Sequence, residues 1–318
     1  MDIFVIIQQM LVLLAMMLVG FIVFRIRWLD DNACSKMSKI VVNVLNPCLM
    51  INGVLGGGAR LEGSMLLQTL ILVVVYYGIL ILLGGPVASL LRAKKEHHSL
   101  YQLMMVFSNV GFMGIPVISS IFGKESMLLI AFYNLGYNLL FYTYGVYLAA
   151  KGGEAQNSNN AQNDEEAAKG GLWRKLVNPG VIACVITITI FATGVVMPES
   201  VCTFFDYVGN AAVPLSMILI GASVAQGGKK EFFLDRRVYA FAAVKMLVIP
   251  IVAAFLFRLL PWPSMVEGVF VLMIAMPVGT TAVMLAADSG ADAIECTKGC
   301  IITTLLSVIT IPIVSAFL

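Results

Sequence analysis

Long apolar runs alternate with short polar connections along almost the whole chain. Each run has about the length of a bilayer-spanning helix, which takes roughly 20 predominantly apolar residues. A helix also satisfies its own backbone hydrogen bonds where no water is present. The pattern therefore predicts an all-α polytopic membrane protein with ten transmembrane helices. In chain order these spans are 3–24, 37–55, 65–91, 99–122, 126–149, 176–197, 203–225, 238–260, 265–287 and 297–317.

The composition agrees with a membrane protein. Hydrophobic residues make up 60% of the chain and charged residues only 12%, whereas a soluble domain carries about 25% charged residues. So few charged residues are not enough to cover the surface of a soluble globular protein. The first apolar run has no basic region before it and no small-residue cleavage site after it, so it indicates a first span rather than a signal peptide.

Lys and Arg gather in every second connection between the spans. The connections after spans 1, 3, 5, 7 and 9 hold 16 of these 20 residues, the other connections hold three, and Lys245 lies inside span 8. Connections rich in Lys and Arg stay in the cytoplasm. We therefore predict a cell-membrane protein with both termini outside and a cytoplasmic linker at 151–174.

The two halves of the chain share a weak repeat. The pieces NVLNPCLMI (43–51) and NAAVPLSMI (210–218) have four residues in common at a constant offset of 167, and NVGFMG (109–114) and PVGTTA (277–282) align at an offset of 168. Five spans per half is an odd number, so the halves would insert with opposite orientation, as in many secondary transporters. The predicted domains are a first five-helix repeat (1–150), the linker (151–174) and a second repeat (175–318).

Spans 4 and 9 carry helix-breaking residues near their middles. Span 4 reads FSNVGFMGIPVISS at 107–120, and span 9 reads MPVGTT at 276–281. Proline cannot donate a helical hydrogen bond, and glycine lowers the cost of unwinding. Irregular backbone at membrane depth persists only where protein buries it or where it lines a cavity. Breaks at matching positions of the two halves indicate a transport site.

The two breaks would create helix ends inside the membrane. The N-terminus of a helix exposes unpaired N–H groups and about half a positive charge, which suits an anion such as a carboxylate. Asn109, Thr280 and Thr281 would add side-chain hydrogen bonds. These features predict a binding site for a small organic anion.

Lys245 lies about eight residues into span 8 and has two interpretations. A lysine inside the membrane is by default a functional residue, and its charge would favour an anionic substrate. Its long side chain could instead extend to the cytoplasmic surface. No Asp or Glu lies near the middle of a span, so the sequence offers no obvious proton carrier. Coupling to Na⁺ or H⁺ stays open.

Other polar residues of the spans also have two interpretations. Asn43, Asn46 and Asn134 are either interhelical hydrogen-bonding residues or ligands of a coupling cation. The five tyrosines of span 5 indicate an aromatic belt at the membrane surface. These are Tyr133, Tyr137, Tyr142, Tyr144 and Tyr147.

Six pieces of the chain resemble the auxin efflux carrier family of membrane transporters, in its bacterial branch of malate- and malonate-type permeases. They follow the order of that family and together cover nearly the whole chain. The absence of the long hydrophilic loop of the plant auxin exporters argues against auxin as the substrate. The six pieces are NPCL (46–49), SNVGFMGIP (108–116), NPG (178–180), VPLSMILIGASVA (213–225), KMLVIP (245–250) and TLLSVITIPI (304–313).

The resemblance implies that spans 4 and 9 unwind and cross at Pro116 and Pro277. It implies a dimerising scaffold of spans 1, 2, 6 and 7, against which spans 3, 4, 5, 8, 9 and 10 carry the substrate in an elevator-like motion. The substrate would lie at the crossing, against the scaffold. Together with the breaks and the span 8 lysine, this nominates as substrate-binding residues Asn109, Gly111, Gly114, Pro116, Pro277, Gly279, Thr280, Thr281, Asn46, Pro47 and Lys245.

We therefore predict a secondary active or facilitative transporter of a mono- or dicarboxylate such as malate or malonate. The alternatives are a sensor with a transporter fold, an anion channel, or a cation-coupled carrier of another organic solute. The chain has no Walker A motif and no paired nucleophile and base in its spans, so neither an ATP-driven pump nor an enzyme is expected. We expect the bilayer, the anion and a second copy of the chain as partners, no nucleic acid, and no cofactor or bound metal other than a coupling ion.

Overall fold

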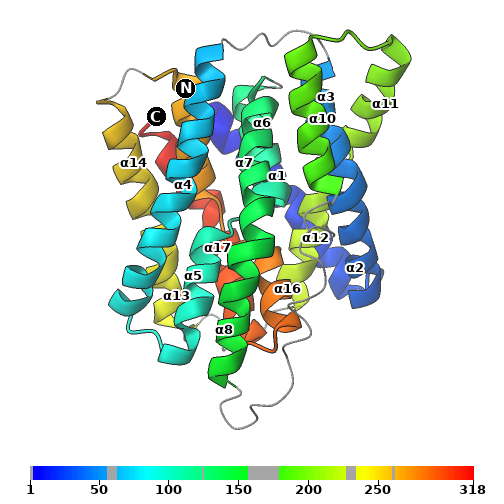
Figure 1. Cartoon of the computed structure of the whole chain (residues 1–318). Coiled ribbons are helices and arrows are strands. Elements are labelled where there is room, and N and C mark those ends of the chain that lie inside the picture. The colour runs from blue at the N-terminus through cyan, green and yellow to red at the C-terminus, as the bar shows by residue number, and fades with distance from the viewer. Residues whose placement is uncertain (1–2, 56–62, 124, 157–178, 227–233, 260–261) are drawn as a thin grey trace.

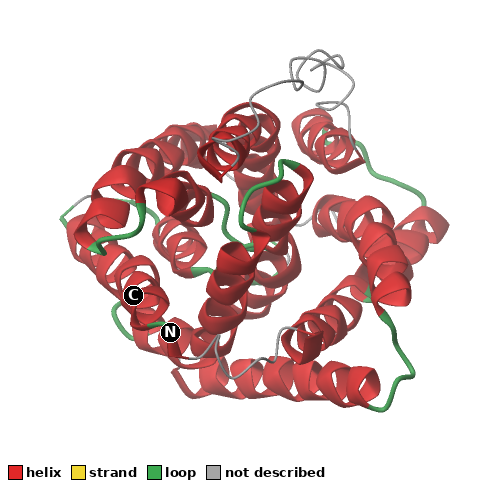
Figure 2. Ribbon diagram, turned by 90° about the horizontal axis from the view of Figure 1, so that it is seen from below, coloured by secondary structure: helices red, strands yellow, loops and turns green. Residues whose placement is uncertain are grey.

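The structure is a computed structural model that describes residues 3–55, 63–123, 125–156, 179–226, 234–259 and 262–318. Its regular elements in these ranges are all helices, joined by short loops (Figure 2). The all-α prediction is therefore confirmed. Strand-like pairing within the described ranges is limited to one isolated antiparallel bridge between Ser108 and Val278.

Helices occupy each of the five ranges predicted in the first half of the chain. Some spans consist of two helices joined by a π-helical turn or by a short extended segment. The helices are α1 (Ile3–Arg25), α2 (Asp31–Ile40), α3 (Asn46–Leu55), α4 (Gly63–Leu90), α5 (His98–Val106), α6 (Ile115–Phe122), α7 (Ser126–Leu140) and α8 (Val146–Gln156).

Helices also occupy the five ranges predicted in the second half. α8 continues to Gln156, so residues 151–156 of the predicted linker are helical; residues 157–174 lie outside the described residues. The helices are α10 (Pro179–Thr193), α11 (Glu199–Asn210), α12 (Ala212–Gln226), α13 (Arg236–Ala243), α14 (Ile249–Phe257), α15 (Ser264–Ala275), α16 (Thr280–Asp288) and α17 (Ala293–Ser315).

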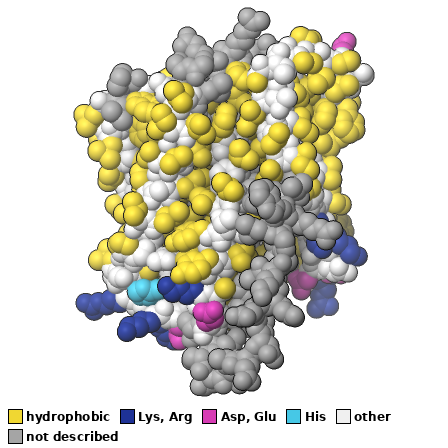
Figure 3. Space-filling model, in the orientation of Figure 1, with side chains coloured by type: hydrophobic (Ala, Val, Ile, Leu, Met, Phe, Trp, Pro, Cys, Tyr) yellow, Lys and Arg dark blue, Asp and Glu magenta, His cyan; other side chains and the backbone are white. Residues whose placement is uncertain are grey.

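Five described helical stretches are long and apolar enough to cross a membrane. Apolar side chains cover most of the face shown in Figure 3, and the Lys and Arg side chains on this face lie toward its lower end. Both chain termini lie at the upper end of the molecule (Figure 1). The chain is therefore a polytopic membrane protein. The five stretches are Asp31–Leu55, Leu67–Leu90, Glu199–Gln226, Arg236–Phe257 and Ala293–Ser315.

A proline follows three of the π-helical turns at the same distance. The proline ring clashes with the carbonyl group one turn earlier in an ordinary α-helix. A π-helical turn displaces that carbonyl, so the helix continues through the proline with a local irregularity. The three pairs are Val41–Leu45 with Pro47, Val110–Gly114 with Pro116, and Val244–Val248 with Pro250.

In two groups of helices the backbones lie very close together: α1 with α12, and α3 with α10 and α11. α1 packs along α12, where Gly20 and Gly221 bring the two backbones so close that a Cβ on either glycine would overlap the other helix. α3 packs against α10 and α11, and a Cβ on Gly209 would lie 2.8 Å from the Cα of Leu49. Small residues allow such close helix packing in membranes.

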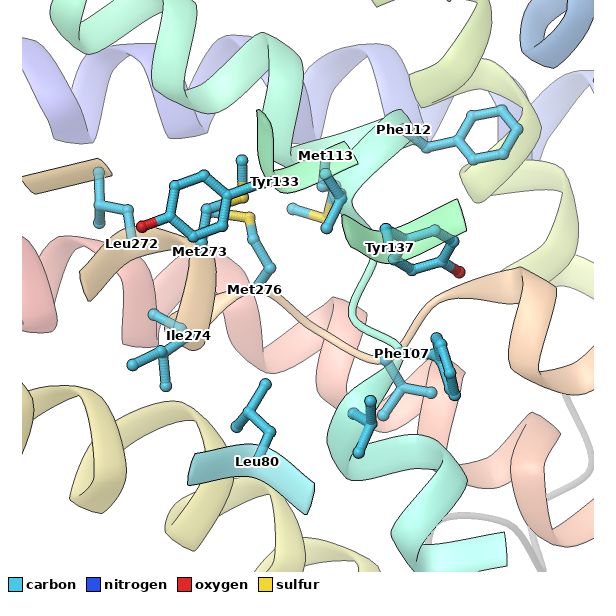
Figure 4. Close-up of a cluster of buried hydrophobic side chains, with 14 of the residues drawn as sticks. Leu80, Phe107, Phe112, Met113, Tyr133, Tyr137, Leu272, Met273, Ile274 and Met276 are labelled. Atoms are coloured by element: carbon cyan, nitrogen blue, oxygen red, sulfur yellow. The ribbon is translucent and has the colours of Figure 1, made fainter. Parts of the chain in front are cut away.

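The remaining helices surround a core of buried aromatic and methionine side chains. α4 packs against α5 and α15, and α17 packs against α16. Tyr76 of α4 is 0% exposed, and its hydroxyl donates to the carbonyl of Met273 at 3.2 Å. This bond holds the end of α15 close to α4. Figure 4 shows Met273 and Met276 beside Met113, where spans 4 and 9 meet.

Candidate functional site

Spans 4 and 9 are both interrupted, as the sequence predicts. In span 4, α5 ends at Val106, and residues 107–109 leave the helix before the π-helical turn Val110–Gly114. In span 9, α15 ends at Ala275, and residues 276–279 are extended before α16 begins at Thr280. Each span therefore consists of two half-helices joined by a short non-helical segment.

The two interruptions cross and bond to each other. The N–H of Asn109 donates to the carbonyl of Pro277 at 2.7 Å, and the N–H of Gly279 donates to the carbonyl of Phe107 at 2.9 Å. Figure 4 shows the two extended segments passing each other beside Phe107 and Met276. Unpaired backbone groups are costly inside a membrane. Each interruption therefore supplies hydrogen-bond partners that the other needs.

The prediction that span 4 crosses at Pro116 is wrong. The non-helical residues end at Asn109, and Pro116 lies seven residues later in the first turn of α6. The sequence is misleading here because a proline is tolerated near the start of a helix and after a π-helical turn. Pro277, in contrast, lies inside the span 9 interruption and accepts the hydrogen bond from Asn109.

A cavity of about 130 Å³ lies on the crossing, with α3 and α7 forming its other walls. Gly111 approaches α3 so closely that a Cβ added to it would lie 3.3 Å from Nδ2 of Asn46. The described residues that line the cavity carry no charged side chain. Six of the predicted site residues line it: Asn109, Gly111, Thr280, Thr281, Asn46 and Pro47.

The other five predicted residues do not line this cavity. Gly114 packs at the span 4–span 9 contact, where a Cβ would lie 3.5 Å from Sδ of Met273. Gly279 precedes the first residue of α16 and, like Pro277, contributes backbone bonds to the crossing. Pro116 lies in the first turn of α6, and Lys245 bonds to Met105 and Ser108 of span 4.

Asn109 connects the crossing to the cavity. Its Oδ1 accepts from the N–H of Phe112 at 3.1 Å and so caps the second half-helix of span 4. Its Nδ2 is buried and has no hydrogen-bond partner in the described structure. A buried donor without a partner costs roughly 1–3 kcal/mol. An acceptor group in the cavity would satisfy it.

Tyr137 of α7 forms part of the cavity wall, which sequence reasoning missed. The predicted surface belt is wrong for Tyr133 and Tyr137, which are only 1% and 9% exposed. The hydroxyls of Tyr137 and Thr281 are in hydrogen-bond contact. The ring of Tyr137 packs edge-on against Phe107 with centroids 5.5 Å apart. Tyrosine clustering alone cannot distinguish a cavity wall from a membrane-surface belt.

Two amide side chains one helical turn apart complete this wall. Asn134 Nδ2 lies 3.4 Å from Sδ of Met50 and 3.7 Å from Sγ of Cys184, both weak acceptors. Asn138 Nδ2 donates to the carbonyl of Asn134 at 2.8 Å. Asn134 is among the polar residues that the sequence singles out, but Asn138 is not. The spacing of four residues in an apolar helix is the sequence signal that could have identified Asn138 as well, because such residues share one helix face.

Lys245 lies behind the cavity rather than at the membrane surface. It is 0% exposed, and its Nζ donates to the carbonyl of Met105 at 3.0 Å and to Oγ of Ser108 at 2.8 Å. The interpretation in which it extends to the cytoplasmic surface is therefore wrong. Ser108 is among the residues that line the cavity, so Lys245 is bonded directly to a lining residue.

A family model for membrane transport proteins matches residues 5–315 of the chain. The chain belongs to this auxin efflux carrier family. The transporter is also 26% identical over 316 residues to an uncharacterized transporter of Methanothermobacter thermautotrophicus, and the match covers 98% of each chain. Membership of a transporter family confirms the predicted family and establishes that the protein is a multi-pass membrane transporter and not an enzyme.

Proposed function

We propose that the transporter moves a small organic carboxylate across the cell membrane by elevator-type alternating access. The observation that carries this proposal is the cavity at the crossing of spans 4 and 9. It joins two half-helix N-termini, an unpartnered buried amide on Asn109, and the hydroxyls of Thr280 and Thr281. The amide and the hydroxyls can donate hydrogen bonds to the oxygens of one ligand, and the helix N-termini add positive partial charge.

The half-helices support an anionic ligand. The helical stretch from Val110 to Phe122 and α16 both begin at residues that line the cavity, namely Val110 and Thr280. At the first end the Val110 N–H donates to the Ser108 carbonyl at 2.8 Å and the Phe112 N–H donates to Asn109 Oδ1 at 3.1 Å. The attraction for an anion therefore comes from the helix dipole, which places about half a positive charge at each N-terminus. A carboxylate placed between them would be stabilised by both ends.

The volume supports a ligand of limited size. The cavity measures about 130 Å³, and an engineered cavity of about 150 Å³ is large enough for benzene. Short carboxylates such as lactate, malonate and malate are near this size. Indole-3-acetate is about twice as large as benzene. The cavity therefore favours a mono- or dicarboxylate with a short carbon chain over auxin.

The position of the cavity supports an elevator-like motion. One wall belongs to α3, which packs with α10 and α11, and the facing wall belongs to the crossing, around which α4, α5, α15 and α17 pack. A substrate between these groups would be carried when one group moves past the other. We propose that spans 1, 2, 6 and 7 form the fixed scaffold, which dimerises, and that the other six spans move.

The two-repeat architecture has support from backbone conformation. Gly123 and Gly290, which are 167 residues apart, both follow a second half-helix and both adopt a positive φ, 76° and 67°. Glycine adopts this conformation without strain. We propose ten spans in two inverted repeats. The termini at one end and the Lys and Arg side chains toward the other support termini outside and basic connections in the cytoplasm (Figures 1 and 3).

Uptake into proteoliposomes tests this function. The purified protein would be supplied with labelled lactate, malonate, malate, succinate and indole-3-acetate, each with and without Na⁺ and pH gradients. We expect saturable uptake and counterflow of a short carboxylate, and the gradient dependence identifies any coupling ion. Large unitary currents would indicate a channel instead. Binding without uptake would indicate a sensor, and the absence of both from folded protein would contradict the proposal.

A further inference from the structure

Lys245 is a buried cation without an acidic partner in the part of the chain that the structure describes. Its ammonium contacts only neutral acceptors there, the Met105 carbonyl and the Ser108 hydroxyl. In an uninterrupted helix the Met105 carbonyl would accept from the N–H of Asn109. That N–H donates to Pro277 instead. Lys245 thus bonds a carbonyl that the crossing has left without its helical partner.

The partial charges of the four helix ends at the crossing sum to about zero, although only the two positive ends, at Val110 and Thr280, are among the residues that line the cavity. Two half-helix N-termini, at Val110 and Thr280, meet two half-helix C-termini, at Val106 and Ala275. Each end carries about half a charge, positive for the former pair and negative for the latter. The described lining of the cavity adds no charged side chain. With Lys245 protonated, the net charge of this region is therefore one positive charge.

An isolated charge inside a membrane protein is costly, and a nearby opposite charge offsets that cost. One carboxylate in the cavity would supply one negative charge. A second carboxylate on the same ligand would lie among uncharged groups such as Asn46, Asn134 and Tyr137. The positive charge at the site thus neutralises a ligand with one negative charge but not a ligand with two.

We propose that Lys245 is the built-in counter-cation of the substrate and that the site selects monocarboxylates over dicarboxylates. This inference rests on the proposed transport function and narrows its substrate class. Lys245 acts as a specificity-determining residue from behind the lining residue Ser108, to which it is bonded. Because its bonds to Met105 and Ser108 tie it to the crossing, it moves with the bound anion. The loaded transport unit then moves without net charge, and the empty unit returns with one positive charge.

A matched pair of ligands tests the charge selectivity. Malonate and malonamate have the same number of heavy atoms, but malonate carries two negative charges at neutral pH and malonamate carries one. Equilibrium binding of both to the purified full-length protein would be measured, together with succinate and succinamate. We expect each monoamide to bind at least about tenfold more tightly than its diacid, a difference of about 1.4 kcal/mol.

Two variants separate the charge of Lys245 from its packing. Lys245→Met should lose most monoamide affinity and the preference for one charge over two, whereas Lys245→Arg should keep the preference. Thermal unfolding and gel filtration would establish that each variant is folded. If Lys245 only capped the Met105 carbonyl, Lys245→Met would be less stable than wild type but would keep the same ligand preference. That result would overturn the inference.

The wild-type comparison requires no variant to fold. Malonate binding as tightly as malonamate would overturn the inference while leaving carboxylate transport intact. Binding of none of the four ligands would contradict the proposed function and this inference with it. A second readout is substrate exchange in vesicles under an imposed K⁺ diffusion potential. We expect wild-type exchange of a monocarboxylate to be insensitive to voltage, and a voltage-sensitive exchange would also overturn the inference.

Discussion

The backbone N–H of Asn109 donates to the carbonyl of Pro277 at 2.7 Å, which joins two residues 168 positions apart (277 − 109). The bond uses only main-chain atoms, so it fixes the relative position of the two interrupted spans whatever their side chains are. The side chain of Asn109 remains available to the cavity. One residue therefore contributes to the architecture through its backbone and to the site through its amide.

Asn109→Asp should abolish carboxylate binding in a folded protein. The new carboxylate keeps an oxygen for the N–H of Phe112 and preserves the helix cap, but it removes the amide donor and places a negative charge in the cavity. We expect affinity to fall by at least about tenfold, or 1.4 kcal/mol. Asn109→Ala should lose the cap as well, at roughly 0.5–2 kcal/mol of stability. Equilibrium binding and thermal unfolding distinguish the two effects.

Pro116→Ala is the matched control for Asn109. Pro116 is buried but does not line the cavity, so the variant should bind carboxylates within about twofold of wild type, a difference under 0.5 kcal/mol. This expectation differs from the one based on sequence, which included Pro116 in the site. A large loss of affinity in Pro116→Ala would show that the cavity depends on this proline.

Tyr137→Phe should weaken binding without preventing folding. The change removes the hydroxyl that contacts Thr281 in the cavity wall, and a lost hydrogen bond typically costs about 0.5–1.5 kcal/mol. Tyr77→Phe removes a comparable buried bond, from the Tyr77 hydroxyl to the Tyr133 carbonyl at 2.9 Å, but away from the described cavity lining. Both variants should lower the unfolding temperature, and only Tyr137→Phe should change the affinity. If Tyr137→Phe bound the carboxylate as tightly as Tyr77→Phe, Tyr137 would not belong to the site.

Gly221→Ala should strongly destabilise the protein. A Cβ at this position would overlap the carbonyl of Met17 in α1, and overpacking of this kind costs about 1–3 kcal/mol or more. Gly78→Ala is the control, since a Cβ there meets no atom within 4 Å. That change should stabilise α4 by up to about 1 kcal/mol because alanine favours the helix. Unfolding temperatures in detergent would show opposite shifts, and similar shifts would contradict the close α1–α12 packing.

Glu295→Gln should destabilise the ends of α5 and α17. Glu295 is only 4% exposed and accepts from the Tyr101 hydroxyl at 3.0 Å and from Lys298 Nζ at 3.1 Å. Loss of its charge should cost about 1–3 kcal/mol. Glu96→Gln is the control. It removes an exposed ion pair with Lys94, and such a pair should contribute less than about 1 kcal/mol to stability. Hydrogen exchange at the start of α17 would report the difference, and equal protection in the two variants would contradict it.

Hydropathy and charge patterns were sufficient to place the helices, because a bilayer imposes a fixed length on each apolar run. They also identified spans 4 and 9 as interrupted, since Gly and Pro occur together near the middle of each span. Six of the predicted substrate-binding residues line the cavity: Asn109, Gly111, Thr280 and Thr281 from the interrupted spans, and Asn46 and Pro47, which the family resemblance nominated.

The details of the site could not be predicted from local sequence. The crossing is at Ser108 and Val278 because distant backbone groups pair there, whereas Pro116 fits within a helix after a π-helical turn. The direction of the Lys245 side chain depends on the Met105 carbonyl, which only the crossing releases. Tyr137 faces the cavity because of how α7 packs, and tyrosine clustering in span 5 does not indicate that orientation.

The paired interruptions also constrain how the protein is made. The N–H of Gly279 bonds to the carbonyl of Phe107, and Gly279 is synthesised 172 residues later (279 − 107). At about 5–20 residues per second, this delay is roughly 10–30 s. During that time span 4 is in the bilayer without its partner. The newly synthesised first half must therefore be shielded by the insertion machinery or hold span 4 as a continuous helix. Its site can form only after span 9 has been inserted, so biogenesis and the capacity to bind substrate are completed in the same step.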